Sequence, residues 1–343
     1  MTTTAWPDEL AQARLHVVTG KGGTGKTTVA AALALALATG GRRTLLVEVE
    51  GRQGIAQLFD TPPLPYEERR IAVAPGGGEV RALAIDVEAA LLEYLEMFYR
   101  LGLAGRALKR MGAVEFATTI APGLRDVLLT GKAKECVVRR DRDGRPAYDA
   151  VVLDAPPTGR VVSFLDVTKA MAGLAKAGPI HSQAEGVVAL LHSPLTAVHL
   201  VTVLEDLPVT EALEAVEQLR AAELRPGAVV VNQVRPKWLP DRSVTAAANG
   251  RVDADRIRAG LSSAGLDLPP DVISALVDET VDHAVRVHAE GLALARLDAG
   301  PDLPRLELPT MVDGIDLGTL YELAEELVGL GVGAQLTGSG ASA

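Results

Sequence analysis

The 343-residue sequence contains a single cysteine, Cys136, and only 3% aromatic residues. One cysteine cannot form a disulfide within the chain or supply a cluster of metal-binding thiolates, which is typical of a protein in a reducing cytosol. We expect Cys136 to be a small buried hydrophobe rather than a reactive thiol. Since 48% of the residues are hydrophobic, the core must consist mainly of Ala, Val, Leu and Ile, which favours helices packed on a parallel sheet.

A targeting segment, a long hydrophobic run and an excess of positive charge are also missing. Residues 1–10 have neither the basic start nor the apolar centre of a signal peptide. The most apolar helical stretch, residues 29–38, has about half the length that spans a bilayer, so it reads as a buried core helix. The formal net charge is −10, which disfavours a nucleic-acid or anionic-membrane surface. We predict a cytoplasmic protein with no integral membrane segment and no nucleic-acid partner.

Short apolar runs separated by helical patterns predict an α/β fold with a mostly parallel, doubly wound sheet. Residues 15–18 and 45–49 are two such runs, and the helical stretch 27–39 between them completes a βαβ unit. Continuous apolar runs are typical of strands that are buried on both faces. Further predicted strands of this kind are residues 80–85, 150–153, 198–203, 228–231 and 305–308.

The domain organisation is predicted to be simple. No internal repeat and no linker divides the chain, so we expect one domain over residues 1–343. Helical patterns without a convincing strand predict a small helical subdomain at about residues 88–134 and 167–191. Residues 240–255 are polar, and residues 338–343 contain only Gly, Ser and Ala, so we expect a mobile segment and a flexible tail there.

The strongest motif is the run Gly20-Lys21-Gly22-Gly23-Thr24-Gly25-Lys26-Thr27, a Walker A phosphate loop that follows a strand and opens a helix. Glycines let backbone N–H groups approach phosphate oxygens, and the helix N-terminus favours negative charge. We expect Lys26 to bridge the β- and γ-phosphates of ATP and Thr27 to ligate Mg²⁺. The predicted nucleotide-binding residues here are Gly22, Gly23, Thr24, Gly25, Lys26, Thr27 and Thr28.

Lys21 places a second positive charge at the start of this loop. The run from Lys21 to Thr28 resembles the deviant Walker A motif of a P-loop ATPase group that includes the arsenical-pump and tail-anchored-protein-targeting ATPases. In that group the additional lysine reaches the nucleotide of the partner subunit. The resemblance therefore implies a dimer in which Lys21 is a catalytic residue acting in trans. The alternative is a solvent-exposed lysine beside the loop.

A second part of the resemblance surrounds Asp154. Residues 149–160 are similar to the strand and turn that follow the phosphate loop in the arsenical-pump and targeting branch. An acidic residue at the end of a strand beside the phosphate-loop strand suits indirect coordination of Mg²⁺. The resemblance implies that Asp154 has the Walker B role and that the turn at residues 156–159 senses the γ-phosphate.

Residues 45–59 resemble the first switch of the same family, with Glu50 where the family has an aspartate. In the family that aspartate positions or deprotonates the attacking water, so Glu50 is the predicted catalytic carboxylate. Its additional methylene moves the carboxylate by about an ångström, and small misplacements slow a reaction. We therefore expect slow hydrolysis.

Two later segments contain the residues that are predicted to bind the base. Asn232-Gln233 ends a predicted strand and resembles the family's Asn-Gln pair, whose asparagine reads adenine with one donor and one acceptor. Asparagine at a strand end is also a common turn residue. Pro309 and Met311 lie where the family packs a loop on the base. The resemblance extends from residue 15 to about residue 328 and is greatest to the actinobacterial anion-transporting ATPase branch.

The resemblance implies a dimeric, ATP-binding and slowly ATP-hydrolysing conformational switch that uses Mg²⁺ and acts on an unknown partner or client. The alternative is a nucleotide-binding regulatory or scaffold subunit with little hydrolysis. It would be paired with a paralogous ATPase, so the dimer is either a homodimer or a heterodimer. One cysteine cannot build the thiolate cluster that holds arsenite. Only 5 methionines are available for the adaptable groove that would bind a transmembrane helix.

Overall fold

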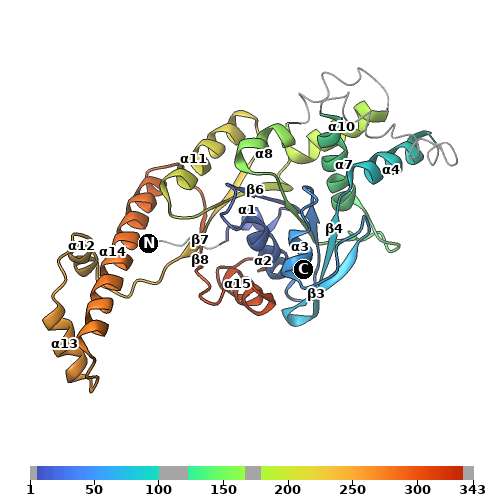
Figure 1. The fold of residues 1–343 in the computed structure, drawn as a ribbon. Helices are drawn as coiled ribbons and strands as arrows, with labels where there is room; N and C mark the ends of the chain where they lie inside the picture. Colours follow the sequence, from blue (N-terminus) through green and yellow to red (C-terminus); the bar gives the residue numbers. More distant parts are fainter. Residues whose placement is uncertain (1–5, 100–122, 167–178, 335–343) are drawn as a thin grey trace, which may run out of the picture.

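A single sheet of eight strands forms the centre of the structure, a computed structural model that describes residues 6–99, 123–166 and 179–334 (Figure 1). The strand order is β3-β4-β2-β5-β1-β6-β7-β8, and every neighbouring pair is parallel except β3 and β4. The strands are β1 (Leu15–Gly20), β2 (Arg43–Glu48), β3 (Arg69–Ala74), β4 (Gly78–Ala84), β5 (Ala150–Asp154), β6 (Thr196–Thr202), β7 (Pro226–Val234) and β8 (Arg305–Pro309). The predicted α/β class with a mostly parallel sheet is confirmed.

Strand β3 is the strand that the sequence did not predict. It lies at the edge of the sheet, where its residues alternate between exposed and buried, and it begins with two arginines. Its antiparallel connection to β4 is the short 3-10 turn η1 (Pro75–Gly77), in which Gly76 and Gly77 have left-handed backbone angles. An edge strand needs only one apolar face, so β3 lacks the continuous apolar run that marks the other strands.

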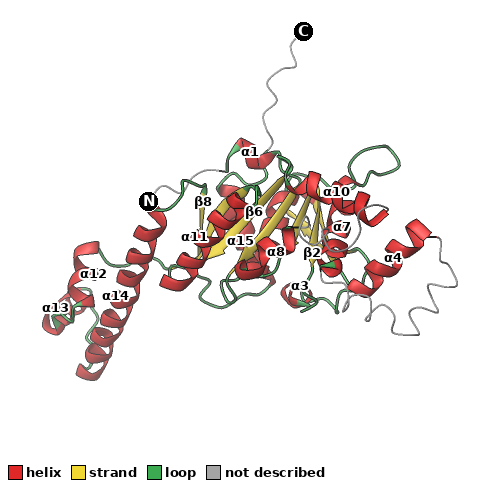
Figure 2. Cartoon of the chain, turned by 90° about the horizontal axis from the view of Figure 1, so that it is seen from above, coloured by secondary structure: helices red, strands yellow, loops and turns green. Residues whose placement is uncertain are grey.

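Helices cover both faces of the sheet, as a doubly wound fold requires (Figure 2). The helices that pack on one face are α1 (Asp8–Ala11), α2 (Lys26–Ala38), α3 (Gly54–Leu58) and α15 (Leu317–Gly329). The helices that pack on the other are α4 (Val87–Tyr99), α7 (Leu124–Val138), α8 (Thr158–Leu165), α10 (Pro179–Leu191) and α11 (Asp206–Ala221). Each face has its own hydrophobic cluster, because side chains on buried parallel strands point alternately to opposite sides.

Helix α2 is enclosed by the sheet and by α15. Residues 29–38 of this helix are all buried, which confirms the prediction of a core helix. Its sequence alternates small alanines with leucines and has no polar face in this stretch, as expected for a helix surrounded by protein. Across the described ranges, none of the helices combines the length and the apolar character needed to cross a membrane.

The region predicted as a helical subdomain is helical wherever the structure describes it. Helices α4, α7 and α10 lie together on one face of the sheet, towards the right of Figure 1, and α7 contacts both of the others. Residues 100–122 and 167–178 lie outside the described residues, as does the predicted flexible tail at residues 338–343. A single domain with a separate helical subdomain stays a prediction.

Between β7 and β8 the chain forms a helical arm, defined here as α12 (Asp241–Ala248), α13 (Ala254–Ser263) and α14 (Pro270–Asp298), which extends away from the sheet (Figures 1 and 2). The sequence predicted a mobile polar segment at residues 240–255, whereas the structure places α12 and the start of α13 there. Val244 and Ala247 of α12 are buried against Ala284 of α14, and the side chain of Asp253 caps the N-terminus of α13. A short helix that packs on one other helix needs few apolar residues, so its composition looks like that of a loop.

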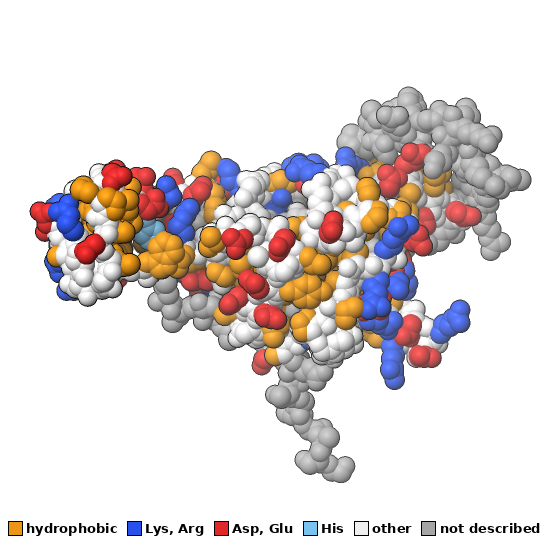
Figure 3. Space-filling model, turned by 60° about the horizontal axis from the view of Figure 1, so that its bottom comes forward, with side chains coloured by type: hydrophobic (Ala, Val, Ile, Leu, Met, Phe, Trp, Pro, Cys, Tyr) orange, Lys and Arg blue, Asp and Glu red, His pale blue; other side chains and the backbone are white. Residues whose placement is uncertain are grey.

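Hydrophobic side chains remain exposed around this arm. In the space-filling view of Figure 3, where the arm lies at the left, hydrophobic surface appears between acidic and basic groups. Trp238 is 72% exposed and Leu292 is 64% exposed, and the indole of Trp238 stacks on the ring of His283. The exposed hydrophobic residues are thus interspersed with charged ones.

Two neighbouring strands of the sheet carry a pair of buried histidines. The backbone N–H of Ala228 donates to Nδ1 of His199 at 3.1 Å, and Nε2 of His199 lies 3.1 Å from Nδ1 of His16. Nε2 of His16 in turn lies 3.1 Å from the carbonyl of Ala13. All three hydrogen bonds form when both rings are neutral and each carries its proton on Nε2. Burial lowers the pKa of His16 to about 4 and that of His199 well below its usual value.

The histidine pair predicts acid sensitivity. Below pH 6.5 the histidines of the unfolded chain bind protons that the folded chain excludes, so unfolding takes up protons. The free energy of unfolding should therefore fall as the pH drops from 6.5 towards 4, by up to about 1.4 kcal/mol per pH unit for each histidine. Urea unfolding at several pH values measures this slope. We expect a shallower slope in His199→Gln and the original slope in His192→Gln, whose ring is partly exposed. Equal slopes in both variants would contradict the assignment.

Candidate functional site

The carboxyl ends of the parallel strands bring the predicted site residues to one edge of the sheet. Strands β2, β5 and β1 are consecutive neighbours. The loops that follow them carry Glu50, the turn after Asp154, and the phosphate loop at residues 21–25. The end of β7 adds Asn232 from the far side of β6. Ligands of open parallel sheets bind in the crevice at this edge.

The phosphate loop has the backbone shape that its glycines predict. Gly23 and Gly25 have φ values of 92° and 84°, in the left-handed region that favours glycine. A Cβ atom at Gly25 would lie 2.4 Å from the amide nitrogen of Asn232, whereas one at Gly22 or Gly23 would meet nothing within 4 Å. The loop therefore packs tightly at its end and leaves open space at its centre, where phosphate oxygens could approach the backbone N–H groups.

Helix α2 begins at Lys26, so Thr27 and Thr28 lie in its first turn. Inside the loop, the buried hydroxyl of Thr24 donates a 2.9 Å hydrogen bond to the carbonyl of Lys21. This contact closes the loop on itself. The helix N-terminus and the closed loop together form the anion-binding geometry expected of the motif.

Asp154 lies beside Thr27, as predicted for a Walker B residue. The Thr27 hydroxyl donates to Oδ2 of Asp154 at 2.7 Å. Burial raises the pKa of Asp154 to about 6, and the negative charges of Glu48 and Glu50 act in the same direction. The hydrogen bond from Thr27 and the charge of Lys26 act in the opposite direction. The second carboxylate oxygen of Asp154, Oδ1, is buried and has no hydrogen-bond partner.

These residues fit a Mg²⁺ ion that binds together with a nucleotide. A hydroxyl and a carboxylate oxygen are hard donors of the kind that Mg²⁺ prefers, and the unpartnered Oδ1 of Asp154 could accept from a metal-bound water. Among the described residues, no three His, Cys, Asp or Glu side chains form a group that could hold a metal by themselves. The remaining ligands of Mg²⁺ would therefore be phosphate oxygens and water, as is common in phosphate-binding enzymes.

Two glutamates, one ending β2 and one just after it, have different surroundings. Glu50, the predicted catalytic residue, has a side chain that is 20% exposed and lies 3.6 Å from Arg52 in an ion pair. Glu48 is 2% exposed, and its carboxylate accepts from the backbone N–H groups of Gln53 at 2.5 Å and Ile55 at 3.5 Å. The sequence analysis missed Glu48, although a glutamate that ends an apolar strand was a visible signal.

Gln53 shows why the buried carboxylate of Glu48 matters. Its backbone has a φ of 58°, a left-handed conformation that costs about 1 kcal/mol for a residue other than glycine. The hydrogen bond to Glu48 holds the backbone of Gln53 in that conformation. The loop that carries Glu50 is thus fixed by a contact at its own base.

Lys21 is bound within its own chain. Its ammonium donates to Oε1 of Glu211 on α11 at 2.5 Å, and Oε2 of Glu211 accepts from the hydroxyl of Thr158 at 3.4 Å. Thr158 opens helix α8 in the turn predicted to sense the γ-phosphate. Glu211 therefore connects the additional lysine of the phosphate loop with that turn. The sequence analysis missed Glu211, and no local motif marks it.

The predicted base-binding residues come together. Asn232 is 5% exposed, and its amide donates to the carbonyl of Thr24 at 2.9 Å. The backbone N–H of Thr310 donates to the carbonyl of Val234 at 3.0 Å, which places Pro309 and Met311 beside the end of β7. The side-chain amide of Asn232 has a second N–H and a carbonyl oxygen with which it could bind a base.

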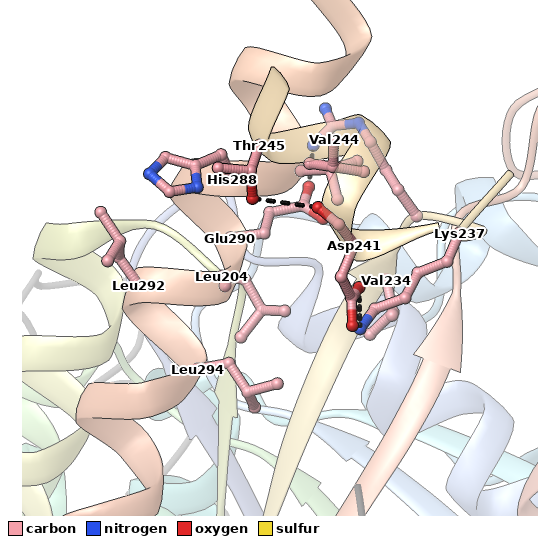
Figure 4. Close-up of a pocket in the computed structure, with 13 residues that line it drawn as sticks. Leu204, Val234, Lys237, Asp241, Val244, Thr245, His288, Glu290, Leu292 and Leu294 are labelled. Atoms are coloured by element: carbon pink, nitrogen blue, oxygen red, sulfur yellow. Dashed lines mark hydrogen bonds and ion pairs between the residues drawn. The ribbon is translucent and has the colours of Figure 1, made fainter. Parts of the chain in front are cut away.

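A cavity of about 200 Å³ lies at the base of the helical arm (Figure 4). Leu204 and Leu294 form part of its apolar lining, while its charged residues are paired, Arg235 with Glu290 and Lys237 with Asp241. None of the predicted site residues lines it. The cavity thus has its own lining, although Val234, whose carbonyl accepts from Thr310, borders it.

The chain matches the family model described as Anion-transporting ATPase over residues 13–193, just over half of its length. This range contains the phosphate loop, Glu50 and Asp154. Asn232, Pro309 and Met311 lie beyond it. The family match thus includes the phosphate side of the candidate site.

Individual relatives extend the similarity. The chain is 63% identical to ATPase BagA of Mycobacterium tuberculosis over 331 residues, which is 96% of this chain and 97% of that protein. It is 26% identical to the arsenical pump-driving ATPase of Acidiphilium multivorum over 275 residues, 74% of this chain and 45% of that protein. It is 28% identical to ATPase get3 of Schizosaccharomyces japonicus over 179 residues, 50% of this chain and 51% of that protein.

The contact between Thr27 and Asp154 predicts a metal-specific defect. Asp154→Asn keeps the shape of the side chain but removes its charge. We expect the affinity for ATP in the presence of Mg²⁺ to fall about tenfold to a hundredfold, while affinity in EDTA changes by less than about twofold. Titration calorimetry under both conditions measures the two affinities. Asp149→Asn, just before the opposite end of β5, is the control and should retain the Mg²⁺ dependence. A uniform loss of affinity in Asp154→Asn would argue against the proposed metal role.

Proposed function

This chain belongs to the anion-transporting ATPase family, and we propose that it is a dimeric, ATP-binding conformational switch that hydrolyses ATP slowly. The observation that carries the proposal is Asp154, a buried carboxylate with one oxygen on Thr27 of the phosphate loop and one without a partner. This arrangement suits a nucleotide-bound Mg²⁺ better than a purely structural contact, because an unpartnered buried oxygen is unfavourable unless a ligand satisfies it.

Each site residue has a role in this proposal. The backbone of residues 22–28 binds the phosphates, and Lys26 contacts the β- and γ-phosphates. Mg²⁺, held by Thr27 and through water by Asp154, would neutralise charge on the phosphate oxygens. Asn232 binds adenine, with Pro309 and Met311 beside the ring. Glu50 orients the attacking water, and its longer side chain and its contact with Arg52 favour a slow reaction.

The contact between Lys21 and Glu211 would have to open before Lys21 could act in trans. The additional lysine is held on α11 of its own chain, with Thr158 on the same carboxylate. We propose that binding of ATP moves the turn at Thr158, weakens its contact with Glu211 and frees Lys21 to reach the nucleotide of a second subunit. Closure of the dimer and a supply of positive charge to the transferred phosphoryl group would then occur together.

Lys21→Ala tests this role. We expect ATP hydrolysis to fall by about a thousandfold, as on loss of an arginine finger, while ATP affinity changes by less than about threefold. Association of subunits in Mg²⁺ and ATP should also be lost, because the lysine connects the two sites. Steady-state phosphate release and analytical ultracentrifugation measure the two effects.

Glu211→Gln is the matched variant, since it weakens the restraint on Lys21 without changing the lysine. We expect ATP-dependent association to persist or to strengthen in this variant. If neither the original protein nor Glu211→Gln associates in ATP, the dimeric switch is wrong. If Lys21→Ala associates as well as the original protein, the role of Lys21 in trans is wrong.

The second candidate function is a regulatory or scaffold subunit that binds ATP, hydrolyses little of it and pairs with a paralogous ATPase. The replacement of aspartate by Glu50 and its ion pair with Arg52 favour this alternative. If the switch is self-sufficient, phosphate release by the isolated protein should fall at least about tenfold in Glu50→Gln. If the chain is regulatory, Glu50→Gln should have no effect alone, and activity should appear only on mixing with a paralogue encoded beside it. The two assays therefore separate the alternatives.

A soft metalloid held by thiolates does not fit as the client of this switch. Cys136 is the only cysteine of the chain, and it is fully buried. Burial raises the pKa of its thiol, with the nearby charges of Glu135 and Glu68 acting in the same direction. A buried, protonated thiol binds soft metals poorly. This confirms the expectation that Cys136 is a small buried residue.

A further inference from the structure

A path of hydrogen bonds and one short backbone segment leads from the candidate site to helices α4 and α7. It begins at Gln53 in the loop that carries Glu50, which is hydrogen-bonded to Leu64, follows the backbone from Leu64 to Tyr66, and continues by hydrogen bonds to Glu93 on α4 and Lys132 on α7. We propose that Gln53 and Tyr66 are positioning residues that couple the loop of Glu50 to helices α4 and α7. The inference rests on the proposed function, since it requires that loop to respond to nucleotide.

The first link is a two-point clamp. The side-chain amide of Gln53 donates to the carbonyl of Leu64 at 3.1 Å, and its carbonyl oxygen accepts from the backbone N–H of Leu64 at 2.6 Å. The backbone N–H of Gln53 is bound to the buried Glu48. Leu64 is itself 5% exposed, packed in the cluster beneath α2. Gln53 therefore cannot move without breaking the clamp or moving Leu64.

The second link is formed by Tyr66, two residues further along the chain. Its hydroxyl donates to Glu93 of α4. Lys132 of α7 donates to both oxygens of the same carboxylate, at 2.8 Å and 3.0 Å, and its ammonium lies 5.5 Å from the centre of the Tyr66 ring. Tyr66 thus contacts one group from each helix, and the lysine that joins the helices is 14% exposed.

Partial burial makes this group of side chains sensitive to movement. In a poorly hydrated site, loss of one hydrogen bond to a carboxylate is not replaced cheaply by water. Glu93 would have to turn towards a new donor if Tyr66 moved, and Lys132 would follow towards Glu135, which it already contacts at 3.2 Å. A displacement of the loop would therefore change how α4 and α7 pair.

The first residue of this path, Gln53, has a strained backbone beside the phosphate loop. Gln53 occupies a left-handed backbone conformation, and the next residue, Gly54, packs on Thr27 of the phosphate loop, where an added Cβ would lie 3.3 Å from the methyl group of that threonine. A change at Thr27 on nucleotide binding would press directly on this backbone. The proposed coupling requires the backbone at Gln53 to have two conformations, whose relative populations both the nucleotide and the helices can shift.

The same region contains a second tyrosine, Tyr148, that is joined to Lys132 only indirectly, through Glu68, Arg139 and Glu135. The hydroxyl of Tyr148 donates to Oε2 of Glu68 at 2.6 Å, and Arg139 at the end of α7 binds the other oxygen. Tyr148 precedes β5 and, in the part of the chain that the structure describes, its side chain makes no hydrogen bond with Gln53, Leu64 or Glu93. Tyr66→Phe and Tyr148→Phe each remove one hydroxyl from a carboxylate in partly buried surroundings, so they differ chiefly in position.

Hydrogen exchange measured by mass spectrometry on the full chain tests the inference. In the original protein, Mg²⁺ with a non-hydrolysable ATP analogue should change the rate of amide hydrogen exchange in α2, α4 and α7 by about threefold or more. In Tyr66→Phe the analogue should still change the rate in α2, but it should change the rates in α4 and α7 by less than about 1.5-fold. In Tyr148→Phe all three changes should remain. Analogue affinity should stay within about twofold in both variants.

The outcomes separate the inference from the function on which it rests. If α2 does not respond to the analogue in the original protein, the proposed ATP-binding function fails. If α2 responds but α4 and α7 do not, the function stands and the coupling is wrong. The coupling is also wrong if Tyr66→Phe keeps the full response, or if Tyr148→Phe loses it equally. Melting temperatures of both variants show whether a loss is only general destabilisation, which would affect α2 as well.

Discussion

The hydrogen bond between Thr27 and Asp154 is the contact on which the candidate site depends. It joins the first turn of α2 to the end of β5, so it links the phosphate loop to the strand beside it. The carboxylate is 8% exposed, and a buried charge of this kind needs donors and nearby cations. Thr27 and Lys26 supply them, and both come from the phosphate loop. The loop and the strand end therefore stabilise each other.

The same contact explains why nucleotide and metal are expected together. Glu48 and Glu50 add negative charge around Asp154, and a triphosphate would bring more. Several carboxylates beside a polyphosphate are unfavourable unless a cation lies between them. Lys21 does not serve this purpose in the described conformation, since Glu211 holds it. The arrangement therefore suits the proposed Mg²⁺ ion.

The parts of the molecule that sequence could predict are those whose physical cause lies in neighbouring residues. Glycines, a helix start and a preceding apolar run define the phosphate loop within eight consecutive positions, and continuous apolar runs define buried strands. Glu211 lies 190 residues from Lys21, so its role appears only when the chain is folded. Strand β3 and helix α12 were missed for a related reason: each buries one narrow face, and their exposed residues obscure the pattern.

Helix α14 has a geometric consequence. It is 29 residues long, which is about 44 Å at 1.5 Å per residue. Only its final turns, with Ala293, Leu294 and Leu297, join the hydrophobic cluster against β7, so about 35 Å of the helix extends beyond this anchor. A tilt of about 10° at the anchor would move the far end by about 6 Å, roughly the pitch of one helical turn. A small change in angle at the anchor on β7, the strand that carries Asn232, would therefore be magnified at the far end of the arm.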